Sequence, residues 1–167
     1  SVSTLQLAQA YMALANGGYR VPITIFKQDA PSVGKQVMPR SVAKNVTKMM
    51  EAVVQRGSGR AAKVPGYSVA GKTGTVHRVG SKGYEYDQYN AMFAGFAPAS
   101  NPRLAMVVIV NDPKGRQYYG GEVAAPVFSR VMEGALTTLN ISPDLPDGLR
   151  EVRIDNKKTP YQVAQGN

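Results

Sequence analysis

The run Lys72-Thr73-Gly74-Thr75 combines the residue types best suited to chemistry in this chain. On a strand at the edge of a cleft, it could bind an extended peptide as one more strand. Lys72 would place a fixed positive charge beside an anion, and the Thr73 and Thr75 hydroxyls would donate to a carboxylate. Gly74 leaves the backbone open to close approach, and the backbone N–H of Thr75 can donate to an oxyanion. The run therefore predicts an anion-binding strand that could support acyl transfer.

An overlapping motif predicts different chemistry. Gly66 to Thr73 satisfies G-x-x-x-x-G-K-[ST], the loop that cradles nucleotide phosphates, and Met106 to Asp112 could supply a magnesium-binding aspartate. A phosphate loop, however, follows an apolar strand and opens a helix at its Lys-Thr. Here Pro65 precedes the motif, and Gly74 with β-branched neighbours follows it, which makes a poor helix start. A nucleotide-binding protein remains an alternative, and a helix beginning at Lys72 would support it.

Three helices that could support this run are predicted from apolar residues at helical spacing. The first begins after the N-cap Ser3, whose capping box Gln6 completes, and ends at Gly17-Gly18. The second opens at Ser41, and the third covers residues 122–139. The expected core-facing residues are Val42, Val46, Met49, Met50 and Val53 in the second helix, and Val123, Val127, Val131, Ala135 and Leu139 in the third.

The strands form a consecutive set in the middle of the chain. Leu104 to Val110 is apolar on both faces, which predicts a central strand covered on both sides. Sequential strands joined by short loops form an antiparallel meander, so the fold class is α+β, an antiparallel sheet with helices on its faces. The predicted strands cover residues 21–26, 67–77, 90–97 and 103–110, with a polar hairpin loop over 79–87.

Composition bounds the remaining possibilities. The chain has 167 residues, 43% hydrophobic and 19% charged, which fits one globular domain and excludes a low-complexity chain. It contains no cysteine and one histidine, so no metal site built from thiolates or several histidines is expected. Its longest apolar run is far below the ~20 residues of a membrane-spanning helix.

Charge is unevenly distributed along the chain. The net charge is +9, and all of it lies in residues 1–80, since the remainder has equal numbers of acidic and basic residues. No run of five like charges occurs. A solvated cationic surface explains this pattern, and we expect no nucleic-acid partner.

The segments around Lys72 resemble a known enzyme family, the penicillin-binding transpeptidases. In that family Lys-Thr-Gly on a strand is the third element of a set whose first two are S-x-x-K and S-x-N. The match is closest to class B, division-specific members of the penicillin-binding protein 3 type. The segments that carry it are Val69 to Thr75, Phe93 to Pro98 and Leu104 to Val108 for the last three strands, Val2 to Ala8 and Ala15 to Tyr19 for the preceding helix, and Tyr118 to Gly121 and Ala124 to Phe128 for the C-terminal helix.

This resemblance implies a serine β-lactamase-like, penicillin-binding transpeptidase-like fold of which only the C-terminal part is present. We expect that part over residues 1–148 and an extended or disordered tail over 149–167. The implied activity is serine acyl transfer at the D-Ala-D-Ala end of peptidoglycan stem peptides during septal cell-wall synthesis. β-Lactams imitate that end and would acylate the same serine.

The resemblance also assigns roles to residues. Lys72 and the backbone N–H of Thr75 would be catalytic, and Thr73, Gly74 and Thr75 would bind the substrate or β-lactam carboxylate. His77 lies two residues beyond Thr75, on the same face by strand alternation, and could also touch that carboxylate. The three further residues expected to line the cleft with aromatic rings are Tyr89, Tyr118 and Tyr119.

The nucleophile is the feature that the sequence does not supply. S-x-x-K occurs at Ser32 to Lys35 and at Ser41 to Lys44, and Ser41 stands at a predicted helix start. An N-cap serine followed by a solvent-exposed lysine explains Ser41 equally well, and no S-x-N lies between Lys44 and Lys72. We therefore expect both earlier motifs upstream of Ser1 and predict that this chain alone is inactive.

A non-catalytic peptide-binding module is the third hypothesis, favoured by the missing nucleophile. The resemblance implies no metal or organic cofactor, because acyl transfer through serine needs none. It places the protein at the periplasmic face of the inner membrane, anchored by an N-terminal helix outside this chain. The implied partners are stem peptides, β-lactams, the N-terminal remainder of the same protein and other cell-division proteins.

Overall fold

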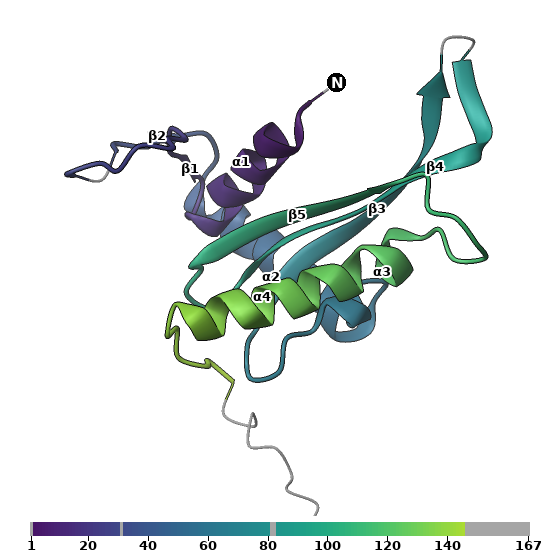
Figure 1. Cartoon of the computed structure of the whole chain (residues 1–167). Coiled ribbons are helices and arrows are strands. Elements are labelled where there is room, and N and C mark those ends of the chain that lie inside the picture. Colours follow the sequence, from purple (N-terminus) through teal and green to yellow (C-terminus); the bar gives the residue numbers. More distant parts are fainter. Residues whose placement is uncertain (1, 31, 81–82, 146–167) are drawn as a thin grey trace, which may run out of the picture.

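The computed structural model describes residues 2–30, 32–80 and 83–145 (Figure 1). The expected tail over 149–167 lies outside these residues, so the expected domain limit at 148 stays a prediction. The elements in chain order are α1 (Thr4–Ala15), β1 (Tyr19–Arg20), β2 (Lys35–Gln36), α2 (Arg40–Arg56), the 3-10 helix η1 (Arg60–Ala62), β3 (Ala70–Gly80), β4 (Gly83–Ala97), β5 (Leu104–Asn111), α3 (Gly120–Val123) and α4 (Ala125–Thr138).

The centre of the molecule is a three-stranded antiparallel sheet in the order β3-β4-β5. Helices α1 and α2 pack on one face of the sheet and α4 crosses the other (Figure 1). This arrangement confirms the α+β fold class with helices on both faces of an antiparallel meander.

Strand alternation divides the hydrophobic core into two layers. Phe93 of β4 points to α4, where its ring meets Phe128 edge-on at a centroid distance of 4.8 Å. Such an aromatic pair adds about 0.5–1.5 kcal/mol to simple burial. Phe96 points to the opposite layer, where it packs with Met50 of α2 and Ala70 of β3. Ala70 at the start of β3 is therefore packed between Phe96 of β4 and Met50 of α2, which fixes the position of the strand.

The predicted helices are correct in place, but their buried faces were predicted only in part, with Met50 of α2 buried as expected. The capping box of Ser3 and Gln6 at α1 is confirmed. In α2, Val42 and Met49 are exposed, and the helix begins one residue before Ser41 without a side-chain cap. The predicted third helix is broken at Ala124 into α3 and α4. The buried residues of α2 and α4 are Ala43, Met50 and Val54, and Ala125, Phe128, Met132 and Leu136.

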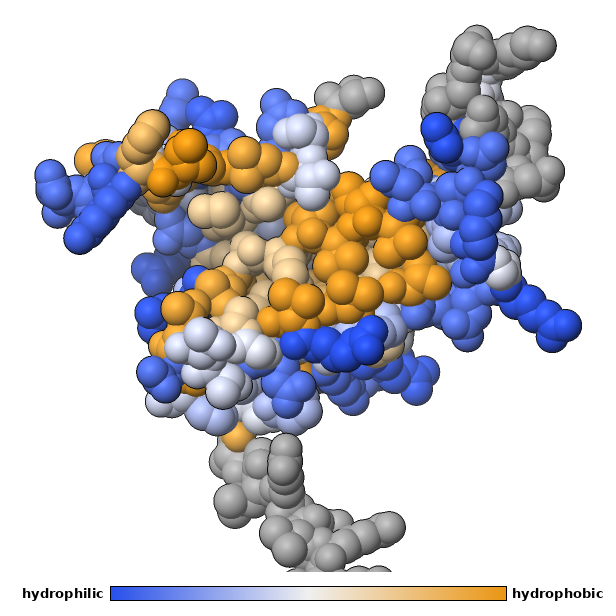
Figure 2. All heavy atoms as spheres, in the orientation of Figure 1, coloured by the Kyte–Doolittle hydropathy of each residue, from blue (hydrophilic) through white to orange (hydrophobic). Residues whose placement is uncertain are grey.

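Three strand predictions need correction. Residues 21–26 form no strand. The strands of this region are β1 and β2, which flank the predicted segment and pair with each other. Residues 79–87 are largely strand, since β3 and β4 extend far beyond the sheet core (Figure 1). Strand β5 is not central: it forms an edge of the described sheet, and Leu104 to Val110 are only half-buried. Figure 2 shows hydrophobic residues gathered over β5 between α1 and α4.

No helix among residues 2–30, 32–80 and 83–145 is both long enough and apolar enough to cross a membrane.

Candidate active site

Strand β3 holds Lys72 to Thr75 at the other edge of the described sheet. Alternation places Thr73 and Thr75 on the face where η1 and α3 lie, and Lys72 on the opposite face. The Lys72 side chain nevertheless folds back along its strand. Its ammonium group donates to the Thr73 carbonyl oxygen at 2.9 Å and lies 3.4 Å from Thr73 Oγ1. The cation and both hydroxyls thus belong to one short stretch of strand.

This geometry overturns the nucleotide-binding alternative. Residues 70–80 form one strand that pairs with β4, and no helix begins at Lys72. A phosphate loop needs successive backbone N–H groups at a helix N-terminus to surround the phosphate. Strand pairing turns alternate N–H groups of residues 71–75 to opposite sides, so they cannot form that cradle.

A groove of about 400 Å³ lies beside β3 where three elements meet. We call it the hydroxyl groove. It is bounded by the loop after α2, by β3 and by the start of α3. Its lining residues are Gly57, Ser58, Arg60, Ala61, Thr73, Thr75, Tyr119, Gly120, Gly121 and Glu122.

Hydrogen bonds tie the two threonines to the elements around the groove. Thr73 Oγ1 lies 2.8 Å from the hydroxyl oxygen of Ser58 in the loop after α2. The backbone N–H of Gly120 at the start of α3 donates to Thr75 Oγ1 at 3.0 Å. With the Lys72 ammonium beside it, this groove presents donors suited to an anionic group.

Close backbone packing explains the glycines at the start of α3. A Cβ added to Gly120 would lie 2.2 Å from the Met92 carbonyl oxygen and 2.6 Å from that of Gly74. A Cβ added to Gly121 would lie 2.3 Å from the Ser58 carbonyl oxygen. Gly120 and Gly121 therefore allow α3 to rest directly on β3, β4 and the loop after α2. At Gly74 the space of a missing side chain is taken by Met92, whose Cγ would lie 2.7 Å from the added Cβ.

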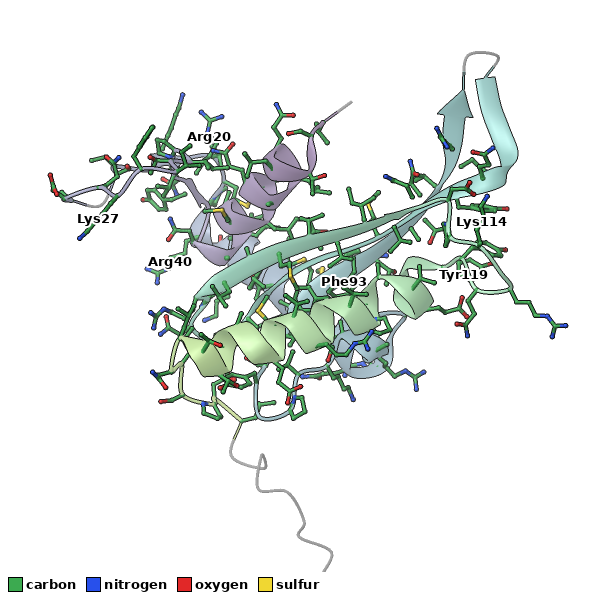
Figure 3. The ribbon with its side chains drawn as sticks, in the orientation of Figure 1. Arg20, Lys27, Arg40, Phe93, Lys114 and Tyr119 are labelled. Atoms are coloured by element: carbon green, nitrogen blue, oxygen red, sulfur yellow. The ribbon has the colours of Figure 1, made fainter. Side chains whose placement is uncertain are left out.

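The three predicted aromatic residues form one continuous stack with His77 beside the hydroxyl groove. The ring centroids are 4.7 Å apart for His77 and Tyr89, 4.4 Å for Tyr89 and Tyr118, and 4.5 Å for Tyr118 and Tyr119. The hydrogen bond between the Tyr118 and Tyr119 hydroxyls and the charge of Tyr119 raise the pKa of Tyr118. Tyr119 lines the groove and is exposed (Figure 3). The stack thus extends the groove wall with aromatic surface.

The structure separates Ser41 and Lys44 from Lys72. Both lie on exposed positions of α2 and line a different groove of about 910 Å³. We call this second site the α1–α2 groove; it is bounded by α1, α2 and residues 99–102. None of the residues from Lys72 to Thr75 lines it. Ser32 lies in the segment before β2, which contributes to neither lining.

Sequence reasoning missed the residues that complete the hydroxyl groove. Ser58 stands between Gly57 and Gly59, which looked only like a loop, and Gly120 and Gly121 looked only like a turn. The available signal for Ser58 was its place between two glycines, which allow a tightly folded backbone to hold a polar side chain in one position. The contacts of Gly120 with Met92 and of Gly121 with Ser58 join distant parts of the chain and left no local signal.

The described part of the chain contains no group of three or more His, Cys, Asp or Glu residues that could hold a metal ion.

Comparison with known proteins decides the family. The family model described as "Penicillin binding protein transpeptidase domain" matches residues 1–133, which include the whole hydroxyl groove. The chain belongs to this family. The expected resemblance is therefore confirmed.

Individual relatives agree with this assignment. The chain is 46% identical to the peptidoglycan D,D-transpeptidase FtsI of Escherichia coli (strain K12), over 86% of this chain and 24% of that protein. It is 41% identical to a probable peptidoglycan D,D-transpeptidase PenA of Neisseria flavescens, over 87% of this chain and 36% of that protein. The chain thus spans about a quarter to a third of the curated relatives it matches.

A solved structure confirms the fold. The transpeptidase domain of penicillin-binding protein 3 from Burkholderia pseudomallei, in its apo form, superimposes with a TM-score of 0.80 at 41% identity. The match covers 87% of this chain and 45% of that one. The chain is accordingly part of a penicillin-binding transpeptidase domain, in which β3 carries the Lys-Thr-Gly element.

Proposed function

We propose that this chain supplies the Lys-Thr-Gly strand of a peptidoglycan D,D-transpeptidase that cross-links stem peptides during septal wall synthesis. The observation that carries the proposal is the convergence at β3 of the Lys72 ammonium with the Thr73 and Thr75 hydroxyls beside one groove. Membership of the transpeptidase family supports the reaction class.

The reaction proceeds by two acyl transfers. A serine hydroxyl attacks the carbonyl of the penultimate D-alanine; the serine proton passes through a base to the departing D-alanine amine, and an ester remains on the enzyme. An amine from a neighbouring strand then takes the acyl group, and the serine regains a proton. The serine and the S-x-N residues come from sequence outside this chain.

Each residue of the site has a role in this scheme. Thr73 and Thr75 donate to the terminal carboxylate of the stem peptide or of a β-lactam, and Gly74 lets the Met92 side chain of β4 pack against the strand between them. Lys72 stabilises the negative charge that develops, and the backbone N–H of Thr75 donates to the oxyanion. The rings of His77, Tyr89, Tyr118 and Tyr119 provide apolar and aromatic surface for the body of the ligand.

The proposal includes a place and partners for the complete protein. It acts at the periplasmic face of the inner membrane, anchored by an N-terminal helix outside this chain, and it works with other cell-division proteins. No cofactor takes part in the transfer, since the serine carries the acyl group itself.

Labelled penicillin tests this proposal. The full-length gene product that contains this chain should become covalently labelled, whereas the 167-residue chain alone should not. Label on the chain alone would identify Ser41 as the nucleophile. Absence of label on the full-length product would refute the transpeptidase assignment. If that product bound a D-Ala-D-Ala peptide without being labelled, it would be a non-catalytic peptide-binding module.

A further inference from the structure

Ser58 is held in the hydroxyl groove by an unusually constrained loop. The backbone N–H groups of Gly57 and Gly59 both donate to the Val53 carbonyl oxygen, at 3.0 and 3.1 Å. A Cβ on Gly57 would lie 2.9 Å from the same oxygen, so the loop has no room for a side chain there. The Ser58 carbonyl oxygen in turn packs against Gly121 of α3. The backbone thus fixes where the Ser58 side chain begins.

The fixed side chain forms a hydroxyl pair with Thr73. Their oxygens are 2.8 Å apart, and a hydroxyl can donate one proton and accept two. The Lys72 ammonium is a donor only, so its contact at 3.4 Å occupies one acceptor position of Thr73 Oγ1. If Thr73 donates to Ser58, the Ser58 proton remains for the groove. If Ser58 donates to Thr73, both acceptor positions of Thr73 are filled and its own proton remains.

Either arrangement leaves the pair with one proton for an acceptor in the groove. Thr75 offers a second, because its oxygen already accepts from the Gly120 N–H at 3.0 Å. A carboxylate has two acceptor oxygens and donates nothing when ionised. The hydroxyl groove therefore offers two directed protons to a ligand group with two acceptor oxygens.

The charges around the pair favour the same kind of ligand. Lys72 contacts Thr73 directly, and Arg60, two residues after Ser58, lines the groove, whereas Glu122 is the acidic residue of the lining. An anion near the Ser58–Thr73 pair would accept its proton beside a cation, and charge-assisted hydrogen bonds are stronger than neutral ones.

We propose that Ser58 is a positioning and specificity residue for the carboxylate end of the ligand. It holds the Thr73 hydroxyl so that the pair presents one directed proton to the groove. This inference rests on the proposed function for the identity of the ligand, but it concerns recognition of a carboxylate rather than acyl transfer. Removing the Ser58 hydroxyl should reduce the preference for a carboxylate over an uncharged end.

Equilibrium binding tests the inference separately from the reaction. The probes are N-acetyl-D-alanyl-D-alanine and its C-terminal amide, titrated into the full-length gene product and followed by NMR. The wild type should prefer the acid. In Ser58→Ala that preference should fall about fivefold, the equivalent of one hydrogen bond, with binding of the amide unchanged. Ser58→Thr keeps a hydroxyl and should retain most of the preference.

The controls distinguish positioning from simple structural damage. Ser41→Ala removes an exposed serine from the α1–α2 groove and should leave the preference intact. A structural defect in Ser58→Ala would weaken the acid and the amide alike and lower the thermal midpoint. An unchanged acid-to-amide ratio in Ser58→Ala, or equal weakening of both probes, overturns the inference. If the wild type were not labelled by penicillin, the proposed function would be refuted. The comparison of acid and amide would still decide whether Ser58 positions a carboxylate.

Discussion

The two grooves of this chain pair serine and lysine side chains in very different surroundings. The α1–α2 groove is more than twice as large as the hydroxyl groove, at about 910 against 400 Å³, and it contains the letters of an S-x-x-K motif. Figure 3 shows Arg40 of the larger groove and Tyr119 of the smaller one at opposite ends of the sheet. Size and the S-x-x-K motif favour the α1–α2 groove as the active site, whereas side-chain geometry favours the hydroxyl groove.

The difference lies in how many elements fix each polar group. In the hydroxyl groove, hydrogen bonds link β3 to the loop after α2 and to the start of α3. In the part of the chain that the structure describes, Ser41 and Lys44 share no hydrogen bond and stand on one exposed helix surface. Chemistry needs donors held in place before the ligand arrives. Polar groups held in place by several helices, strands and loops therefore identify the site better than a sequence motif or the volume of a groove.

The largest effect is expected for the charge at Lys72. Lys72→Met keeps much of the side-chain volume but removes the ammonium that donates to Thr73. Acylation of the full-length product by labelled penicillin should slow about 100-fold or more, the range found when a stabilising donor is removed. Thermal stability should hardly change, because the side chain is exposed. Lys44→Met makes the same change in the α1–α2 groove and should leave the rate unchanged; equal effects of both would break the comparison.

Gly120→Ala should have the next largest effect, by pushing α3 away from the sheet. Its Cβ would meet two backbone carbonyl oxygens at 2.2 and 2.6 Å, so neither contact can be relieved by a side-chain rotation. We expect a loss of about 1–3 kcal/mol in the free energy of unfolding and slower acylation, as the donor to Thr75 moves. The observable is the denaturant midpoint of the full-length product.

Gly134→Ala is the matched control for that substitution. Gly134 lies within α4, and a Cβ there would meet nothing within 4 Å. Alanine in an open helical position stabilises by about 0.5–1 kcal/mol. If the two alanine variants shifted stability in the same direction, α3 would not depend on the close approach at Gly120.

A smaller effect is expected at Asp144, which belongs to the other end of the molecule. Its carboxylate accepts from the Ser68 N–H at 2.7 Å and from the Ser68 and Ser100 hydroxyls, and Ser100 lines the α1–α2 groove. Desolvation alone would raise the pKa of Asp144, but the hydrogen bonds from Ser100 and Ser68 outweigh it and hold that pKa below 3.8.

The lowered pKa fixes the sign of the pH dependence. A carboxyl group with a depressed folded-state pKa adds stability above its unfolded-state pKa, and that stability is lost as pH falls through the folded-state value. Thermal stability should therefore decline below pH 3.8 more steeply in the wild type than in Asp144→Asn. Near neutral pH, Asp144→Asn should lower the thermal midpoint without changing the acid-to-amide preference of the hydroxyl groove. Equal pH slopes would contradict this account of Asp144.

Local sequence signals were enough for the parts of the fold that depend on neighbours in the chain. The capping box of Ser3 and Gln6 and the meander around Lys72 were both predicted and are both present. The stripe chosen for α4 was wrong because Val131 and Leu139 suggested a face that the sheet does not cover. The sheet instead selects Phe128, Met132 and Leu136, which meet Phe93 and its neighbours.

Features set by distant contacts could not be predicted in this way. The apolar run of β5 predicted a central strand covered on both sides, but the strand lies at an edge of the described sheet and is only half-buried. The Ser58–Thr73 pair joins residues 15 apart, and the contact of Gly120 with Met92 depends on how α3 meets the sheet. The residue types of the site were readable in the sequence, whereas the residues that hold them in place required the fold.

The smallest expected effect is at Ser41, where the sequence motif and the structure disagree most directly. Ser41→Ala should leave penicillin labelling of the full-length product unchanged, since Ser41 lies on an exposed turn of α2 away from the Lys72 strand. Its stability should change by less than about 0.5 kcal/mol, as for most surface substitutions, because the helix begins without a side-chain cap. Lost labelling with an unchanged thermal midpoint would make Ser41 the nucleophile. It would also transfer the chemistry to the α1–α2 groove, against the convergence of donors at β3.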